Sequence, residues 1–179
     1  MPIAQILNVL TEQNKRAFFI PMDNNLIPSN QELLDLRLVE DILMVGYPNG
    51  LWDEVNNMPL FRKGITSSHP SLDWNGKSEM LIDAACFPGS SGSPVFLFNE
   101  GGYVDRKGTT HMGSSRVKLL GILYAGPQHT AKGEIKIVTV PTSVAPMAVT
   151  GVPNNIGIVI KSIKLDELNK IFEKEVTEK

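Results

Sequence analysis

Met80-Leu-Ile-Asp-Ala-Ala-Cys-Phe-Pro-Gly-Ser-Ser-Gly-Ser-Pro-Val-Phe96 contains an apolar strand, a tight glycine-rich turn and a second apolar strand. A serine held in such a turn exposes its hydroxyl, and neighbouring backbone N–H groups can converge on one point. Acyl transfer needs both, because a nucleophile attacks a carbonyl and hydrogen-bond donors stabilise the oxyanion that forms. Gly89 favours this geometry, since glycine reaches backbone angles closed to other residues and can turn its N–H inward. The segment therefore predicts a β-rich fold that displays a reactive serine.

Short apolar segments separated by turn residues recur along the whole chain. The 15 glycines and 12 prolines divide it into stretches rich in Val, Ile, Leu and Phe. Many short strands joined by turns are typical of a β-sandwich or β-barrel, so we expect an all-β fold. The expected strands span residues 17–21, 42–46, 59–67, 80–85, 94–98, 117–124, 134–141 and 156–160. Segments 99–115 and 142–155 are expected to be long loops, which often rim a site on a β scaffold.

Two segments have helical character. Residues 29–38 contain several leucines but are short, so a helix and a linker both remain open. In the C-terminal segment, apolar residues recur at steps of three and four: Leu165, Leu168, Ile171, Phe172 and Val176. Acidic residues near its start and a lysine near its end follow the charge order that a helix dipole favours. We therefore expect a C-terminal α-helix that packs its apolar stripe against the barrel.

Composition excludes several classes of protein. Among 179 residues, 17 Lys+Arg and 19 Asp+Glu give a net charge of −2, so no basic excess attracts nucleic acid or acidic lipid. No apolar run approaches the roughly 18 residues that a membrane span requires. The single cysteine, Cys86, cannot form an internal disulfide, and three scattered histidines cannot complete a zinc site with it. We expect one globular domain, or two small packed halves, with no metal and no organic cofactor.

Segment 88–95 resembles the Gly-x-Ser-Gly-(Gly/Ser)-Pro signature of trypsin-like serine proteases, and segment 83–85 resembles the Asp-Ala-Ala of the bacterial HtrA-like branch. Three further segments resemble parts of the second barrel of that family. Residues 41–50 are similar to the strand and turn that open it, 120–126 to the strand that pairs with substrate, and 155–161 to the last strand. The resemblance implies a trypsin-like β-barrel fold. Residues 1–40 would be a remnant of the first barrel and a linker, 41–164 the complete second barrel, and 165–179 a C-terminal helix.

The resemblance also implies site residues for serine endopeptidase chemistry on a polypeptide. Ser91 would be the nucleophile, and the backbone N–H groups of Gly89 and Ser91 would form the oxyanion hole. Ala85 would lie at the base of the primary pocket, where the lack of an acid argues against Arg or Lys specificity and favours small or apolar side chains. The substrate-binding strand would contribute Leu123, Tyr124, Ala125 and Gly126.

The sequence lacks the partners that activate the serine in that family. There the base is a histidine in the first barrel, followed by an aspartate, and both precede the serine. His69, His111 and His129 all follow the start of the second-barrel region, and we interpret each as a surface or loop residue. His129 is the one expected near the pocket wall. Without a base we expect the chain to be nearly inactive, retaining about 10³–10⁴-fold acceleration over water. Stoichiometric labelling of Ser91 by a fluorophosphonate would contradict this.

Three functions remain open. The first is the serine-bearing part of an endopeptidase, truncated at its N-terminus. The second is a degenerate protease that binds peptides along an edge strand without hydrolysing them. The third is a β-barrel protein that uses the turn only structurally. Genomic sequence upstream of Met1 would separate the first two. A complete chain would indicate a cytoplasmic protein, and a missing N-terminal segment would allow export.

Overall fold

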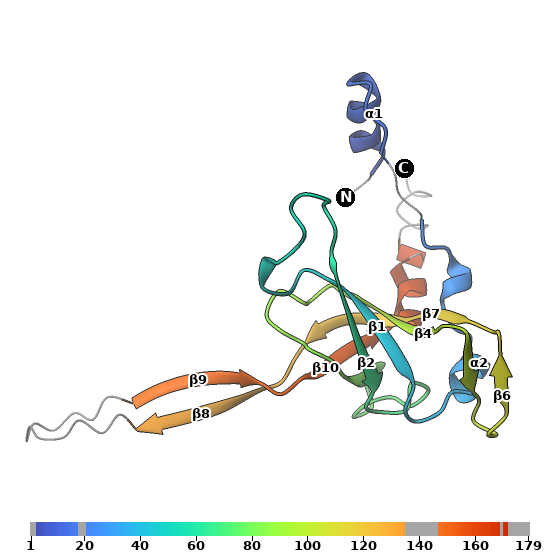
Figure 1. The fold of residues 1–179 in the computed structure, drawn as a ribbon, viewed down its shortest axis with the longest axis vertical. Coiled ribbons are helices and arrows are strands. Elements are labelled where there is room, and N and C mark those ends of the chain that lie inside the picture. Colours follow the sequence, from blue (N-terminus) through green and yellow to red (C-terminus); the bar gives the residue numbers. More distant parts are fainter. Residues whose placement is uncertain (1–2, 18–20, 135–146, 169, 172–179) are drawn as a thin grey trace, which may run out of the picture.

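A closed β-barrel forms the centre of the molecule (Figure 1). The computed structural model describes residues 3–17, 21–134, 147–168 and 170–171, with the backbone alone for 128–134 and 147–153. Six antiparallel strands pair in the order β1-β2-β3-β10-β7-β4, and β4 closes onto β1. They are β1 (Asp41–Gly46), β2 (Leu60–Thr66), β3 (Glu79–Asp83), β4 (Pro94–Asn99), β7 (Arg116–Ala125) and β10 (Ile156–Lys161). The described chain is thus mostly β, as the sequence predicts.

The remaining elements decorate this barrel. Two hairpins extend it, β5–β6 (Gly102–Val104 and Thr110–Met112) and β8–β9 (Gln128–Glu134 and Met147–Pro153), the second of which projects outward in Figure 1. The helices are α1 (Ala4–Glu12), α2 (Asn30–Leu34), and the 3-10 turns η1 (Asn24–Leu26), η2 (Pro48–Gly50) and η3 (Ser162–Lys164). Among the helices in the described ranges, none is long and apolar enough to cross a membrane.

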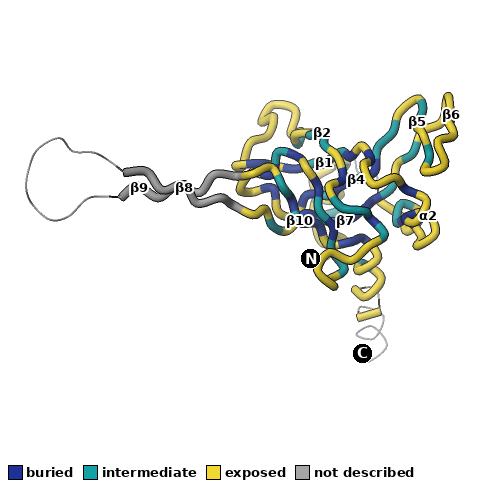
Figure 2. The backbone as a smooth tube through the Cα atoms, turned by 90° about the horizontal axis from the view of Figure 1, so that it is seen from below, coloured by how far each residue is buried: buried dark blue, intermediate teal, exposed yellow. Residues whose placement is uncertain are grey.

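The core fills the barrel because alternate residues of each strand point inward. Buried and more accessible residues alternate along β1, β3 and β4, and Figure 2 shows the buried positions gathered on the barrel strands. Fully or almost fully buried side chains from five of the strands meet there: Ile42, Met44, Met80, Ile82, Val95, Leu97, Leu120, Leu123 and Val159. This apolar interior fixes the register of these five strands, because a shift by one residue would turn these side chains to solvent.

The strands β7 and β10 approach each other so closely at Gly121 that no side chain fits. A Cβ atom built there would overlap the carbonyl oxygen of Ile160 and crowd the Val159 side chain. Gly121 pairs with Lys161 in the regular part of the β7–β10 ladder, beyond the bulge between Ile158 and Val159. Glycine at 121 is therefore a steric requirement of the closed barrel.

Most predicted strands are confirmed, and four predicted segments have a different outcome. The predicted strands 17–21 and 134–141 lie largely outside the described residues. The prediction of a loop over 142–155 is wrong, because β9 occupies 147–153 and pairs residue by residue with β8. Segment 99–115 contains the β5–β6 hairpin, and α1 was not among the predicted elements.

The two predicted helices have different outcomes. A helix forms at 30–34, where a capping box starts it: the Ser29 hydroxyl accepts from the Glu32 N–H, and the Glu32 carboxylate accepts from the Ser29 N–H. The C-terminal segment is helical from 165 onward in its described part. Its predicted packing is wrong there, because Leu168 and Ile171 are 48% and 53% exposed. The helix leaves the end of the barrel and lies largely in solvent (Figure 2), while Phe172 and Val176 lie outside the described residues.

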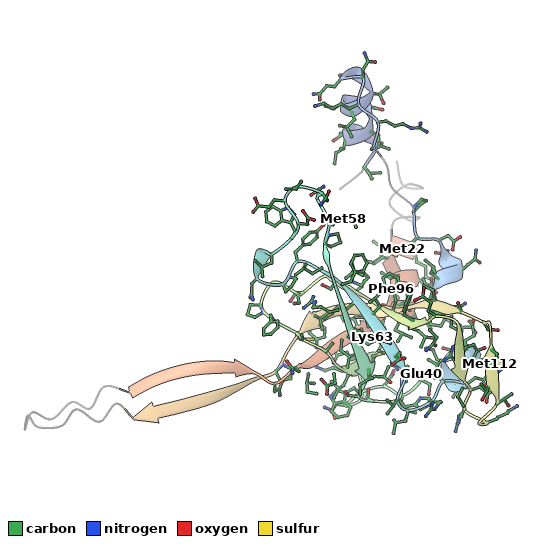
Figure 3. All side chains as sticks on the ribbon, viewed as in Figure 1. Met22, Glu40, Met58, Lys63, Phe96 and Met112 are labelled. Atoms are coloured by element: carbon green, nitrogen blue, oxygen red, sulfur yellow. The ribbon has the colours of Figure 1, made fainter. Side chains whose placement is uncertain are left out.

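A buried ion pair ties the start of β1 to β7. Glu40, labelled in Figure 3, has a side chain only 4% exposed, and it accepts a 2.7 Å hydrogen bond from Arg116 Nη2. Its other carboxylate oxygen accepts from the Arg37 backbone N–H at 2.8 Å. The Arg116 guanidinium also stacks over the Tyr103 ring, 3.7 Å from the centroid. The pair therefore joins the barrel to the β5–β6 hairpin.

Glu40→Gln is expected to destabilise the fold by about 3 kcal/mol. Both carboxylate oxygens of Glu40 accept hydrogen bonds, but the side-chain amide of glutamine has only one oxygen. Its NH₂ group must therefore face a hydrogen-bond donor. The charge of Arg116 also loses its partner, because the amide is neutral. Urea unfolding followed by circular dichroism measures the change. Asp41→Asn is the matched control, because Asp41 pairs with Lys63 at 3.6 Å between exposed side chains, and it should cost less than about 1 kcal/mol. Equal losses for the two variants would show that burial of the pair is unimportant.

Candidate functional site

The segment between β3 and β4 is a double turn braced by the β1–β2 loop. The Ser90 N–H donates to the Phe87 carbonyl at 3.0 Å, and the Ser93 N–H donates to the Ser90 carbonyl at 3.1 Å. Gly89 has φ +82°, in the left-handed region that glycine favours. A Cβ atom at 89 would also lie 3.1 Å from the Asn49 nitrogen. Because the Asn49 N–H donates to the Pro88 carbonyl at 2.7 Å, the loop holds the turn in this shape.

Two backbone N–H groups of this turn are free to bind a ligand. Within 89–93, the N–H groups of Ser90, Gly92 and Ser93 donate to backbone carbonyls. Those of Gly89 and Ser91 have no hydrogen-bond acceptor in the described part of the chain. These are the two N–H groups that the resemblance assigns to an oxyanion hole.

The Ser91 hydroxyl is the accessible one among the three serines of the turn. Ser90 is 1% and Ser93 4% exposed, whereas Ser91 is an exposed residue. Its hydroxyl donates a 3.1 Å hydrogen bond to the carbonyl of Tyr124, at the end of β7. A weak bond between an exposed hydroxyl and a carbonyl leaves the oxygen available to react. It does not activate the oxygen, because a carbonyl accepts no proton.

A small hollow opens beside Ser91, between the turn and the end of β7. Its volume is about 160 Å³, and it is bounded on the turn side by 86–88 with Ser90 and Ser91. On the strand side lie three of the four predicted strand residues, Leu123, Ala125 and Gly126, together with Pro127. The Tyr124 side chain lies elsewhere, because its hydroxyl donates to Glu79 at 2.9 Å, and this bond raises the pKa of the phenol. Ala85 does not border the hollow.

The described histidine side chains are occupied away from Ser91. His69 contacts the Leu36 carbonyl at 3.1 Å and the Ser71 hydroxyl at 2.9 Å. His111 hydrogen-bonds Asp105 at 3.0 Å, which together with a bond from the Thr109 N–H lowers the Asp105 pKa to about 2. For His129 the structure describes the backbone alone, within β8. The structure therefore places the unpaired N–H groups of Gly89 and Ser91 in the same turn as the exposed Ser91 hydroxyl, and no described side chain that could act as a base contacts Ser91.

A second, larger hollow lies around the β5–β6 hairpin. It measures about 570 Å³ and is lined by Tyr103 and many charged residues. Three of its basic side chains have carboxylate partners, His111 with Asp105, Arg116 with Glu40 and Lys118 with Glu32. Arg106 donates to the Leu34 carbonyl, Asp35 accepts from the Gln31 amide, and Lys107 has no side-chain partner among the described residues. We interpret this hollow as the joint between the hairpin and α2. Nowhere in the described ranges do three His, Cys, Asp or Glu side chains gather as they would around a metal.

Sequence analysis missed Arg62, on β2, whose guanidinium lies directly behind the turn. Its Nη1 donates to the Ala85 carbonyl at 2.5 Å and to the Ser90 hydroxyl oxygen at 2.8 Å. Its Nε and Nη2 are shielded from solvent and have no partner in the described chain. Removal from solvent lowers the Arg62 pKa, and the nearby Cys86 raises it, but a guanidinium stays charged. Burial of the Cys86 thiol raises its pKa, and the positive charge of Arg62 lowers that pKa by a smaller amount.

Arg62 could have been noticed from the period of its strand. In β2, the less exposed residues are Arg62, Gly64 and Thr66, which share the inward face of the strand. Arg62 is thus the charged residue on this face. A charged residue on the interior face of a strand is unusual and needs a partner. No carboxylate of the described residues lies within 4 Å of its guanidinium.

Comparison of this chain with models of protein families, with curated proteins and with solved structures found no match in any of the three. The geometry of the turn and the resemblance in sequence are therefore the two observations that point to a function.

Proposed function

We propose that the turn between β3 and β4 is the acyl-transfer site of a trypsin-like serine endopeptidase, with Ser91 as the nucleophile. One observation carries the proposal. Within 89–93, the unpaired N–H groups are those of Gly89 and Ser91, and the exposed hydroxyl is that of Ser91. An acyl-transfer site requires these groups together, namely a reachable oxygen and two donors fixed before reaction.

The place of the turn in the barrel supports the proposal. The segment that resembles the opening of the second barrel begins with β1, and the segment that resembles its last strand forms β10 and leads into a helix. The segment that resembles the substrate-binding strand is the end of β7, which borders the hollow. All three stretches are strands of one closed barrel, and the end of β7 borders the hollow beside Ser91, which supports the proposal.

The proposed reaction follows from these groups. The Ser91 oxygen attacks the carbonyl carbon of a peptide bond, and its proton passes to a base that the described residues do not supply. The carbonyl oxygen becomes an oxyanion, which the N–H groups of Gly89 and Ser91 stabilise; one such donor is worth about 10²–10³-fold in rate. The C–N bond then breaks, the amine leaves with a proton, and water hydrolyses the ester on Ser91.

Hydrolysis of an activated ester with added imidazole tests this proposal. N-acetylalanine p-nitrophenyl ester has a good leaving group, so it needs no protein acid, and imidazole can serve as the missing base. We expect slow hydrolysis by the protein alone and a rise of about 10²-fold or more when imidazole is added, since a general base contributes about 10²–10⁴-fold. The reference is the same imidazole solution without protein. If protein adds nothing to that rate, the site does not transfer acyl groups.

Peptide binding without hydrolysis is the second candidate function, and one observation favours it. β4 pairs with β7 only as far as Ile122, and the backbone of Leu123 bonds Gly92 and Ser93 of the turn. Beyond Leu123, no backbone group of the described chain pairs with β7 on this side. An extended peptide can add to such an edge through backbone hydrogen bonds. Protein that binds peptides with micromolar affinity but shows no imidazole-dependent hydrolysis would be assigned this function.

A further inference from the structure

We propose that Arg62 and Ser90 make the hollow beside Ser91 selective for an acidic side chain, so that the preferred peptides carry Glu or Asp on the acyl side of the scissile bond. The inference rests on the proposed function, because it takes this hollow as the place of the substrate side chain. It replaces the expectation of small or apolar specificity, which was drawn from Ala85 without knowledge of Arg62.

The Ser90 hydroxyl carries the effect of Arg62 into the hollow. Ser90 borders the hollow, and its oxygen accepts a 2.8 Å hydrogen bond from Arg62 Nη1. The hydroxyl proton then remains to be donated, and no acceptor for it exists among the described residues. A bond from a guanidinium polarises the hydroxyl and makes it a stronger donor. The best acceptor that a peptide side chain offers to such a donor is a carboxylate.

The charge of Arg62 favours the same ligand. The guanidinium is half-buried, two of its nitrogens are shielded and unpartnered, and no described carboxylate lies within salt-bridge distance. An unpaired positive charge removed from water attracts an anion more strongly than an exposed one does. At about 160 Å³ the hollow accommodates one side chain rather than a whole ligand, which fits a single Glu or Asp.

The test compares two peptides that differ in charge but hardly in shape. Acetylated tetrapeptides ending in Glu or in Gln are titrated into the full ¹⁵N-labelled chain, and the dissociation constants are read from shifts of the backbone amide signals. We expect the Glu peptide to bind at least 10-fold more tightly, with the Gly89 and Ser91 amide signals among those that move. Equal affinities, or no binding of either peptide at millimolar concentration, would overturn the inference.

Variants identify the residues responsible. Arg62→Met should abolish the preference for Glu, and Lys63→Met, on the neighbouring exposed position of β2, should retain it. Arg62 also supports the turn through Ala85, so Ser90→Ala provides a second variant that keeps the guanidinium. Ser90→Ala should reduce the preference for the Glu peptide over the Gln peptide several-fold. If Ser90→Ala or folded Arg62→Met binds the Glu peptide with an undiminished preference, the assignment is contradicted.

The same measurements separate this inference from the proposed function. A Glu preference in binding, without any imidazole-dependent ester hydrolysis, would support acidic selectivity and refute catalysis by Ser91. Equal hydrolysis of acetyl-Glu and acetyl-Gln p-nitrophenyl esters, with both rates dependent on Ser91, would support catalysis and refute the selectivity.

Discussion

Ser91→Ala is expected to lower imidazole-stimulated ester hydrolysis by the protein by about 10²-fold. The substitution removes the only exposed hydroxyl of the 89–93 turn and leaves the free N–H groups of residues 89 and 91 in place. Without an oxygen nucleophile no ester forms on the protein, so imidazole no longer stimulates the two-step route. The remaining N–H groups should leave a small residual rate of direct attack by water.

The fold should survive this substitution, which makes the result easy to interpret. The Ser91 side chain lies in solvent and makes one hydrogen bond, to Tyr124, so its removal should change the free energy of unfolding by about 1 kcal/mol or less. Ser114→Ala is the control, because Ser114 is exposed in the turn before β7 and should retain the full rate. Protein-dependent hydrolysis by folded Ser91→Ala at more than a tenth of the original rate would identify a different nucleophile.

Gly121→Ala is expected to destabilise the barrel by about 4 kcal/mol or more. The added methyl group meets the backbone of β10 at Ile160, inside a hydrogen-bonded strand pair, rather than the end of a flexible side chain. Relief requires β7 and β10 to move apart, and this breaks the pairing that closes the barrel. Because a domain of this kind has a free energy of unfolding of about 5–15 kcal/mol, much of the protein should be unfolded at 37 °C.

Gly76→Ala distinguishes this clash from the general effect of replacing a glycine. Gly76 has φ +73° in a turn, and nothing lies within 4 Å of the position that a Cβ atom would take. Its replacement should therefore cost only the backbone strain, about 1–2 kcal/mol. Urea unfolding followed by circular dichroism measures both variants. If Gly121→Ala is no less stable than Gly76→Ala, the β7–β10 approach can relax and is not a requirement of the fold.

Local sequence patterns predict the barrel strands and the turn well, because both depend on neighbouring residues. Short apolar runs bounded by turn residues mark the strands β1, β3, β4 and β10, and Gly89 with Ser91 marks the turn. The position of β7 beside the turn also agrees with the resemblance in sequence. The sequence thus predicts where Ser91, Leu123, Ala125 and Gly126 lie, although their chemical roles remain proposals.

Features that depend on distant contacts could not be predicted in this way. Arg62 reaches the turn only because β2 and the 84–93 segment meet across the closed barrel, and no local pattern reports that meeting. The sequence does not predict strand β9, because its glycine and proline are typical of a loop, whereas its pairing with β8 decides its conformation. The C-terminal helix has a regular apolar stripe, but the direction of the chain after η3 carries Leu168 into solvent.

The bond between the Asn49 N–H and the Pro88 carbonyl makes the turn that carries the proposed nucleophile adjustable from a separate part of the chain. Substitutions or insertions in the surface loop after β1 can shift the Gly89 peptide while residues 84–93 stay unchanged. Directed evolution of this protein could therefore randomise the loop alone and select for altered turnover, with the sequence of the serine turn held constant throughout.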